Sequence, residues 1–279
     1  MLDKIEEIGK SIIQHGKFNN RIYLLKLDPE DNGEIISDLE QLASQEGYSK
    51  IFCKIHSGAL PFFLIRGYTI EAYVPRFYDG KTDCLMVSRF LDEERSRPPL
   101  DELKLFSEWL EIGENSVNNS ITNNSAQYEL CNLDINDIIP ITEVFKQVFE
   151  TYPFPVHDPD YILDTMRKNK AKYFGIRDAD KLIAVSTADI DIKGKNAEMT
   201  DFAVLPEYRG SRLAYRLLLL MEENIKSDGI KTAYTIARLR EPGMNKTFIR
   251  AGYKYSGTLV NNTNIGGNIE SMNIFYKHF

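Results

Sequence analysis

The feature that most constrains this chain is residues 197–214, which pass from a strand through a tight turn into a helix. The strand, Asn196–Val204, is rich in apolar and β-branched residues, and a long helix with regularly spaced leucines begins at Arg212. Backbone N–H groups at the start of such a helix lack internal partners and lie at its positive end, so they can hold a phosphate. Arg209 and Arg212 add positive charge, and Gly210 lets the backbone approach an anion closely. The segment therefore predicts a pyrophosphate-binding turn.

This segment resembles motif A of the GNAT N-acetyltransferases, whose turn reads Arg/Gln-x-x-Gly-x-Gly/Ala. Arg209 fills the first position and Ala214 the last, but Arg212 stands where the family usually has glycine. The order of elements over residues 128–279 also resembles the GNAT fold. The resemblance implies acetyl-CoA as co-substrate, no metal, and an α/β (α+β) fold with a mixed, mostly antiparallel sheet. The cofactor-binding residues that it implies are Phe202, Ala203, Val204, Arg209, Gly210, Ser211, Arg212, Leu213, Ala214 and Asn245.

Two carboxylates in the strand are candidates for the catalytic base. Acetyl transfer needs an unprotonated amine, and a free alkylammonium has a pKa of about 10.4, so a base helps. Glu198 lies four residues before Phe202, a spacing that in some GNAT members carries the general-base glutamate, and Asp201 is its rival. Because side chains alternate along a strand, we expect the two on opposite faces, with Glu198 facing the thioester. The family's usual acid tyrosine is replaced by Phe248, which leaves the general acid unassigned.

The two halves of the chain show the same order of strands and helices. In each half a strand ends at a proline, a helix ends at a glycine, a second strand follows, and a helix–Gly–Tyr unit leads to two final strands. The matching segments are Asp28-Pro29 with Leu205-Pro206, Gly47 with Gly229, and residues 63–68 with 248–253. The turn after Pro29, residues 30–34, is acidic and would repel an anion. We therefore expect only the second half to hold the cofactor.

These patterns predict a degenerate GNAT-like domain at 1–112, an Asn/Ser-rich linker at 113–127 and a catalytic domain at 128–279. The strands that we expect lie at 21–27, 49–56, 68–78, 83–90, 128–133, 172–176, 182–190, 196–204, 231–238, 253–260 and 270–277. The helices that we expect lie at 34–45, 59–65, 137–150, 160–168, 212–227 and 242–251. A charged connector, 93–109, is expected to become helical after Pro99.

Composition limits the partners and the compartment. A net charge of −7 and a pI of about 5.3 disfavour binding to nucleic acid or to an anionic membrane. Cys53, Cys84 and Cys131 are odd in number and far apart, which argues against disulfides or a zinc site and favours a reducing cytoplasm. The N-terminus lacks a signal pattern, and the longest apolar run is too short to span a bilayer. Oligomeric state does not follow from the sequence.

Taken whole, the chain resembles the β-lysine N6-acetyltransferases of methanogens and Bacillus. The similarity covers both halves, including residues 14–17, 201–203, 206–210 and 243–245. It implies that the acceptor is the ε-amine of β-lysine and that the product is Nε-acetyl-β-lysine, a net-neutral compatible solute. The acceptor-side candidates are Tyr152, Asn262 and Glu270, in or beside loops that border the acceptor in the family.

Two alternatives remain open at this stage. One is the same chemistry on another amine, such as a polyamine, an amino acid, an aminoglycoside or a protein lysine, because acceptor sites diverge on one scaffold. A free carboxylate on the acceptor would need a cationic or amide partner in the pocket, whereas a polyamine would need only carboxylates. The other is a non-catalytic acyl-CoA sensor, which the departures at Arg212 and Phe248 favour slightly.

Overall fold

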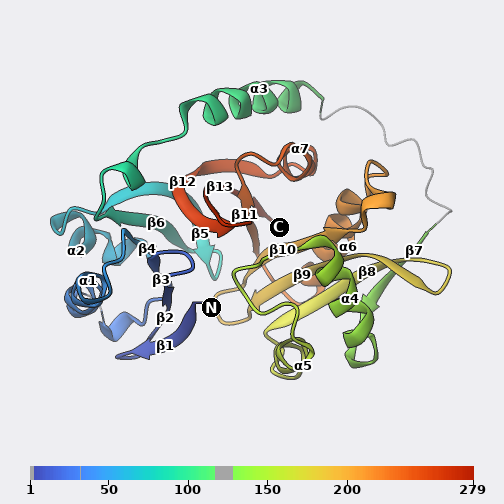
Figure 1. Cartoon of the computed structure of the whole chain (residues 1–279), viewed down its shortest axis with the longest axis horizontal. Helices are drawn as coiled ribbons and strands as arrows, with labels where there is room; N and C mark the ends of the chain where they lie inside the picture. Colours follow the sequence, from blue (N-terminus) through green and yellow to red (C-terminus); the bar gives the residue numbers. More distant parts are fainter. Residues whose placement is uncertain (1–2, 32, 117–127) are drawn as a thin grey trace.

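A single mixed sheet of 13 strands runs through both halves of the molecule (Figure 1), in a computed structural model that describes residues 3–31, 33–116 and 128–279. Its order is β1-β2-β3-β4-β6-β5-β12-β13-β11-β10-β9-β8-β7. The first half comprises β1 (Lys4–Ile8), β2 (Ser11–Gly16), β3 (Arg21–Lys26), α1 (Glu34–Glu46), β4 (Lys50–His56), α2 (Leu60–Ile65), β5 (Thr69–Tyr78) and β6 (Thr82–Phe90).

Helix α3 (Leu100–Ser116) connects the halves. The second half comprises β7 (Glu129–Leu133), α4 (Ile138–Val148), α5 (Pro159–Arg167), β8 (Ala171–Asp178), β9 (Lys181–Asp191), β10 (Asn196–Val204), α6 (Leu213–Ser227), β11 (Thr232–Arg238), α7 (Pro242–Arg250), β12 (Lys254–Ile265) and β13 (Asn268–His278). None of the helices in the described ranges is long and apolar enough to cross a membrane.

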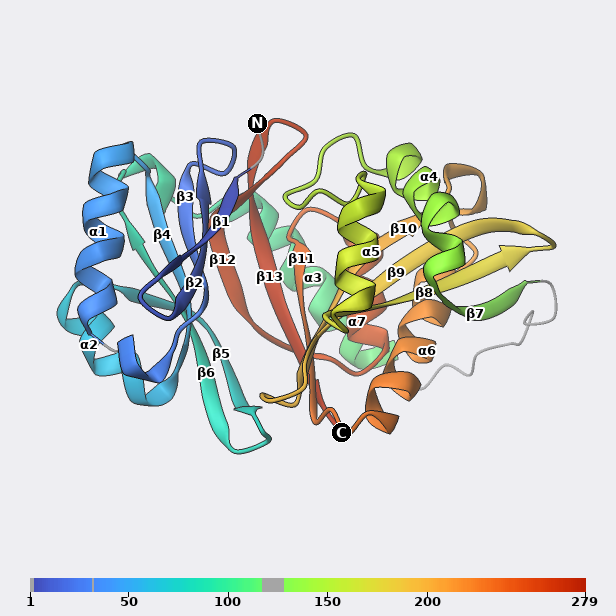
Figure 2. The ribbon, with the colours of Figure 1, turned by 90° about the horizontal axis from the view of Figure 1, so that it is seen from below.

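The strand order confirms the repeat read from the sequence. The arrangement β1-β2-β3-β4-β6-β5 matches β8-β9-β10-β11-β13-β12, and each copy has one parallel pair, β3·β4 or β10·β11. The copies join through equivalent strands, because β5 pairs with β12 at Ala72 and Gly257. A side chain at Gly257 would lie 2.0 Å from the carbonyl oxygen of Glu71, so this junction requires glycine. In Figure 2, β12 and β13 of the second copy lie at the centre, with the first copy on one side and the other strands of the second half on the other.

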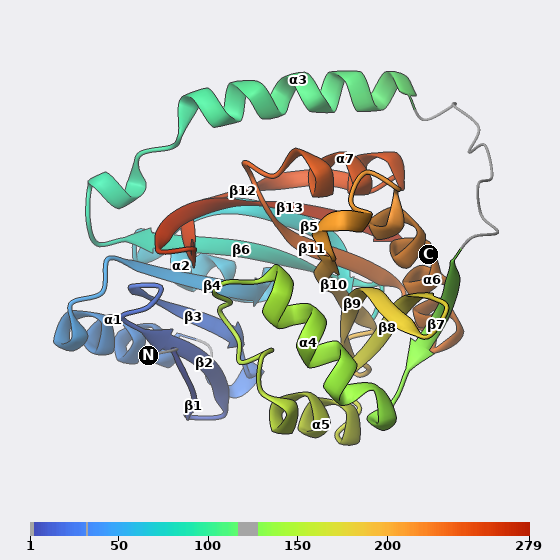
Figure 3. The same cartoon turned by 45° about the vertical axis from the view of Figure 1, so that its right-hand side comes forward.

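Most expected elements are present within a few residues, but three differences matter. Strands β1 and β2 were not predicted, and β12 extends to Ile265 through a segment expected to be a loop. Helix α3 continues through the first four residues of the predicted linker; the rest of it, 117–127, lies outside the described residues, as does Asn32 of the acidic turn. Figure 3 shows α3 running alongside α7, where Phe106 packs on Phe275 with ring centroids 6.0 Å apart.

Each half has its own apolar core, and a third cluster joins them. The joining cluster includes Phe52 and Phe77 from the first half and Tyr234 and Ile274 from the second. Phe77 and Tyr234 meet edge to face, with ring centroids 4.9 Å apart. The first half therefore packs directly beside β11, the strand that borders the site described next.

Candidate active site

Strands β10 and β11 separate at Glu198. Their parallel pairing runs from Asn196↔Thr232 to Glu198↔Tyr234 and then stops. Beyond this point β10 stays paired with β9, whereas β11 stays paired with β13. The divergence leaves one edge of the rest of β10 free for a ligand, as expected from the sequence, and it places Glu198 and Tyr234 at the fork.

A bulge in β10 changes which way its carboxylates point. The pairing register with β9 shifts between Thr200 and Ala203, and Asp201 has a φ of 54°, the left-handed region that non-glycine residues rarely adopt. The extra residue breaks the alternation of side chains. Both Glu198 and Asp201 consequently line the same cavity. The prediction that they point to opposite faces was wrong, because it assumed a regular strand.

The cavity has a volume of about 1160 Å³ and lies between the two halves. It is large enough for a small molecule. Charged residues of both signs line it: Arg21, Lys26, Lys54, Asp164, Lys170, Asp189, Asp191, Lys193, Glu198, Asp201, Arg238 and Glu241. Tyr152 and Asn262 line it as well. Two of the three residues predicted to contact the acceptor therefore face this space.

Three carboxylates, Asp189 on β9 and Glu198 and Asp201 on β10, line the cavity and have raised pKa values. Burial raises the pKa of Glu198 above its usual value, and it also raises the pKa of Asp201. Desolvation by the surrounding protein and the charges of Asp201 and Glu198 raise the pKa of Asp189, although its side chain is exposed to the open cavity. The hydroxyl of Tyr152 donates to Asp201, and the Thr200 hydroxyl donates to it at 3.1 Å. Glu198 is thus the less restrained of the two predicted bases.

The turn before α6 has the properties that a pyrophosphate needs. Within the described chain, the backbone N–H groups of residues 210–215 have no hydrogen-bond acceptor, and the next N–H, of Arg216, bonds to the Arg212 carbonyl. Arg209, Gly210, Ser211 and Arg212 are exposed, whereas Ala203 and Leu213 are buried and anchor the strand and the helix. The residues present therefore fit acetyl-CoA, with free N–H groups at the helix start and a free strand edge in Phe202–Val204.

Arg212 keeps the backbone shape that glycine would give. It is the residue before the first turn of α6, with φ 56° and ψ 25°. Its side chain is exposed, so the departure from the motif does not fill the turn. The substitution costs conformational strain instead, typically about 1 kcal/mol for a non-glycine residue in this region.

The equivalent turn of the first half is occupied by its own side chains. The Asp31 carboxylate accepts from the Lys10 backbone N–H at 2.8 Å and from the Ser11 hydroxyl at 2.7 Å. A carboxylate therefore lies just before α1. At the equivalent position of the second half, the start of α6 has free backbone N–H groups. This arrangement supports the expectation that only the second half binds the cofactor.

Two predicted site residues are structural. Asn245 is fully buried, its amide donates to the carbonyls of Arg238 and Glu241 at 2.8 and 2.7 Å, and its oxygen accepts from Asn273 at 2.9 Å. It has no capacity left for pantetheine, so its assignment to the cofactor is corrected. Glu270 is only 4% exposed and binds the Arg238 guanidinium through both oxygens, each at 2.8 Å. It does not line the cavity and is not an acceptor residue.

The position of the usual acid tyrosine is apolar. Phe248 is buried against Phe202, with ring centroids 5.7 Å apart and rings perpendicular. Tyr253 is buried outside the cavity, so it does not replace the missing acid. A different tyrosine, Tyr234, lies at the fork opposite Glu198, and burial together with the Glu198 charge raises its pKa well above the usual value. Sequence reasoning missed it because its one signal, pairing beside Glu198, appears only once the strand register is known.

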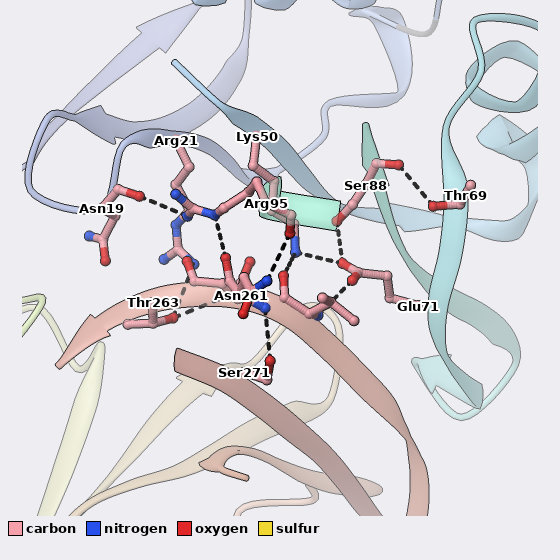
Figure 4. Close-up of polar contacts among 12 residues, drawn as sticks. Asn19, Arg21, Lys50, Thr69, Glu71, Ser88, Arg95, Asn261, Thr263 and Ser271 are labelled. Carbon is pink, nitrogen blue, oxygen red and sulfur yellow. Dashed lines mark hydrogen bonds and ion pairs between the residues drawn. The ribbon is translucent and has the colours of Figure 1, made fainter. Parts of the chain in front are cut away.

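Residues of the first half also hold a segment of β12 that lines the cavity (Figure 4). Strand β12 leaves its partner β13 between Leu259 and Thr263, and the bulged segment is held from across the molecule. The Arg21 guanidinium donates to the Asn262 carbonyl and to the Thr263 hydroxyl, the latter at 3.1 Å. Lys50 donates to the Val260 carbonyl at 2.7 Å. Residues 262 and 263, which line the cavity, are therefore placed by the first half.

A mixed sheet that splits beside a helix start with free N–H groups defines a CoA-dependent acyltransferase. Residues 139–250 match the acetyltransferase (GNAT) family. The β-lysine N(6)-acetyltransferase of Methanococcus maripaludis is 41% identical to this chain over 99% of both sequences. N-acetyltransferase YodP of Bacillus subtilis is 32% identical, again over 99% of both. The β-lysine N(6)-acetyltransferase of Methanosarcina mazei is 30% identical over 88% of this chain and 96% of its own.

The chain belongs to the GNAT acetyltransferase family. It is an N-acetyltransferase that uses acetyl-CoA as its co-substrate.

Proposed function

We propose that this enzyme acetylates the ε-amine of β-lysine to give Nε-acetyl-β-lysine. The observation that carries the proposal is the cavity lined by both signs of charge, in a chain 41% identical over its whole length to a β-lysine N(6)-acetyltransferase. β-Lysine has two amines and one carboxylate, so its recognition requires carboxylates and at least one cation. The carboxylates are Glu198, Asp189 and Asp201, and the basic residues of the first half that line the cavity supply the positive charge.

Glu198 is the proposed general base. It lies at the fork of β10 and β11 and lines the cavity. Its raised pKa brings its proton affinity closer to that of an amine, which favours proton removal at neutral pH. Asp201 is tied to Tyr152 and Thr200, so its proposed role is to hold the loop of Tyr152 and to add negative charge near the amine.

Acetyl-CoA, when bound, supplies an activated acetyl thioester, and residues of the chain bind its pyrophosphate and its pantetheine arm. The free N–H groups of residues 210–215 would hold the pyrophosphate, with Arg209, Gly210, Ser211, Arg212, Leu213 and Ala214 forming the turn. The open edge of Phe202, Ala203 and Val204 would hold the pantetheine arm. The Tyr234 hydroxyl is the candidate to return a proton, because Tyr234 pairs with Glu198 at the fork and lines the same cavity.

We further propose that 128–279 form the catalytic unit and that 1–112 shape its acceptor side without binding a cofactor. The contacts of Arg21 and Lys50 with β12 support this division of roles. We also propose that the reaction takes place in the cytoplasm, with which the free thiols of Cys53, Cys84 and Cys131 are in keeping.

The test is to follow thiol release from acetyl-CoA with β-lysine, α-lysine or spermidine as the acceptor. The proposal predicts the highest kcat/KM with β-lysine. Faster turnover with spermidine would favour a polyamine acceptor, for which the carboxylate-rich wall of β9 and β10 is the supporting observation. Binding of acetyl-CoA without turnover of any amine would contradict the proposal.

A further inference from the structure

Lys54 brings a positive charge from the first half to the fork of the second. It lies on β4, lines the cavity, and donates from Nζ to the hydroxyl of Tyr234 at 2.9 Å. Tyr234 in turn pairs with Glu198 in the strand register, close enough for the Glu198 charge to raise its pKa. Only one side chain, that of Tyr234, therefore separates this lysine from the proposed base.

Among the residues that the structure describes, half-buried Lys54 lacks the carboxylate partner that Lys50 has. In the described part of the chain, no carboxylate lies within 4.0 Å of its Nζ, and its one hydrogen bond is to a neutral hydroxyl. Lys50, four residues earlier on the same face of β4, shows the usual solution: its Nζ lies 2.8 Å from Glu71 and 2.7 Å from the Val260 carbonyl. An ammonium has three donors, so Lys54 has capacity for another acceptor.

The surroundings of Lys54 favour its ammonium form. Burial alone would lower the pKa of Lys54, but neighbouring acidic groups, Tyr23 and Glu198 first among them, raise it above the usual value for lysine. A surrounded cation without an ion pair is costly, and an anionic ligand would remove that cost. Arg21, a buried cation from this half that also lines the cavity, is already committed through its guanidinium to the Asn262 carbonyl and the Thr263 hydroxyl.

We propose that Lys54 binds the carboxylate of the acceptor, so that the first half of the chain supplies the selectivity for an amino acid over a simple amine. This inference rests on the proposed function. The charges of the cavity are arranged for it: the carboxylates Asp189, Glu198 and Asp201 come from β9 and β10, and Lys54 comes from the other half. An acceptor with a reacting amine and a distant carboxylate would lie between them.

The experiment compares β-lysine with its carboxamide, which keeps both amines and the length but removes the negative charge. Lys54→Met removes the ammonium and retains most of the volume, and Lys54→Arg keeps a positive charge. Lys26→Met, at the exposed end of β3, is the matched control, because it removes another cation that lines the cavity. Each variant is assayed for kcat/KM with both acceptors, after thermal unfolding has shown that it is folded.

We expect the wild type to prefer β-lysine over the carboxamide by roughly 10- to 100-fold, the range for a hydrogen bond to a charged group. Lys54→Met should abolish this preference by lowering kcat/KM for β-lysine alone, Lys54→Arg should retain much of it, and Lys26→Met should leave it intact. An equal loss of kcat/KM with both acceptors would instead show that Lys54 acts through Tyr234 on Glu198, and unchanged kcat/KM values with both acceptors would show no contact. Either result overturns the proposal.

The outcome for the proposed function is read separately, from the wild type. A wild-type enzyme that prefers β-lysine, with a preference that Lys54→Met does not change, refutes the role of Lys54 alone. A wild-type enzyme that prefers spermidine to β-lysine refutes both the substrate and the carboxylate contact.

Discussion

Glu198 and Asp201 line one cavity although three positions separate them along the same strand. The bulge at Asp201 places two acids beside the fork, and they differ in their surroundings. Asp201 is held by hydroxyl donors, whereas Glu198 lies next to Tyr234 at the point where the strands diverge. This difference assigns them different roles and makes the assignment testable.

Glu198→Gln should lower kcat by roughly 10²- to 10⁴-fold near neutral pH, the range for loss of a general base. The base acts when deprotonated, and burial raises its pKa, so wild-type activity should rise with pH through a value above that of an ordinary glutamate. The variant should lack this rise and should approach the wild type at high pH, where more of the free amine is already deprotonated. The measurement is a pH profile of kcat and kcat/KM.

Asp201→Asn is the matched control for that profile. Because Asp201 is tied to Tyr152, we expect a smaller loss of rate and an acid limb that remains. If the limb disappears in Asp201→Asn and remains in Glu198→Gln, the two roles are reversed.

Arg212→Gly and Arg212→Ala separate the backbone of the pyrophosphate turn from its side chain. Both variants remove an exposed guanidinium, but only glycine removes the conformational strain of a positive φ at this position. We expect the KM for acetyl-CoA to change less than about twofold in both, because N–H groups make the contact. Arg212→Gly should unfold about 2–4 °C above Arg212→Ala, the shift that about 1 kcal/mol produces. A large and equal rise in KM would show that the side chain binds phosphate.

Glu71→Gln should loosen the junction between the two halves. Lys50 is fully buried and pairs with Glu71 at 2.8 Å, so the variant leaves an uncompensated ammonium. The expected loss is about 3–5 kcal/mol in the free energy of unfolding, measured with urea. Glu93→Gln removes an exposed partner of Arg97 and should change stability by less than about 0.5 kcal/mol. Equal effects of the two variants would mean that the Lys50 pair does not hold the junction.

Much of the fold was predictable because it depends on local patterns. The strand–turn–helix segment, the helix–Gly–Tyr units and the repeat all follow from apolar spacing and from helix ends, and the structure contains them. Strand β1 was missed because Lys4–Ile8 is a short edge strand with three charged residues, which resembles a solvated segment. The long end of β12 was missed because its asparagines suggest a loop, and the contacts that extend it come from the other half.

The site was less predictable, for a different reason. A polar residue can contact a ligand or form hydrogen bonds within the protein. Which of the two it does depends on partners that the sequence pattern does not reveal. The sequence suggested that Asn245 and Glu270 bind ligands. In the structure the Asn245 amide donates to backbone carbonyls, and the Glu270 carboxylate pairs with Arg238. Lys54 and Tyr234 gave no signal, because they meet only when β4 and β11 are brought together.

The most direct test of the account is to determine which nitrogen of β-lysine receives the acetyl group. Wild-type enzyme is given acetyl-CoA and β-lysine, and the product is examined by NMR for the carbon that bears the amide. The account predicts acetylation of the ε-nitrogen alone. Acetyl on the β-nitrogen, or no acetylated product while acetyl-CoA is bound, would contradict it.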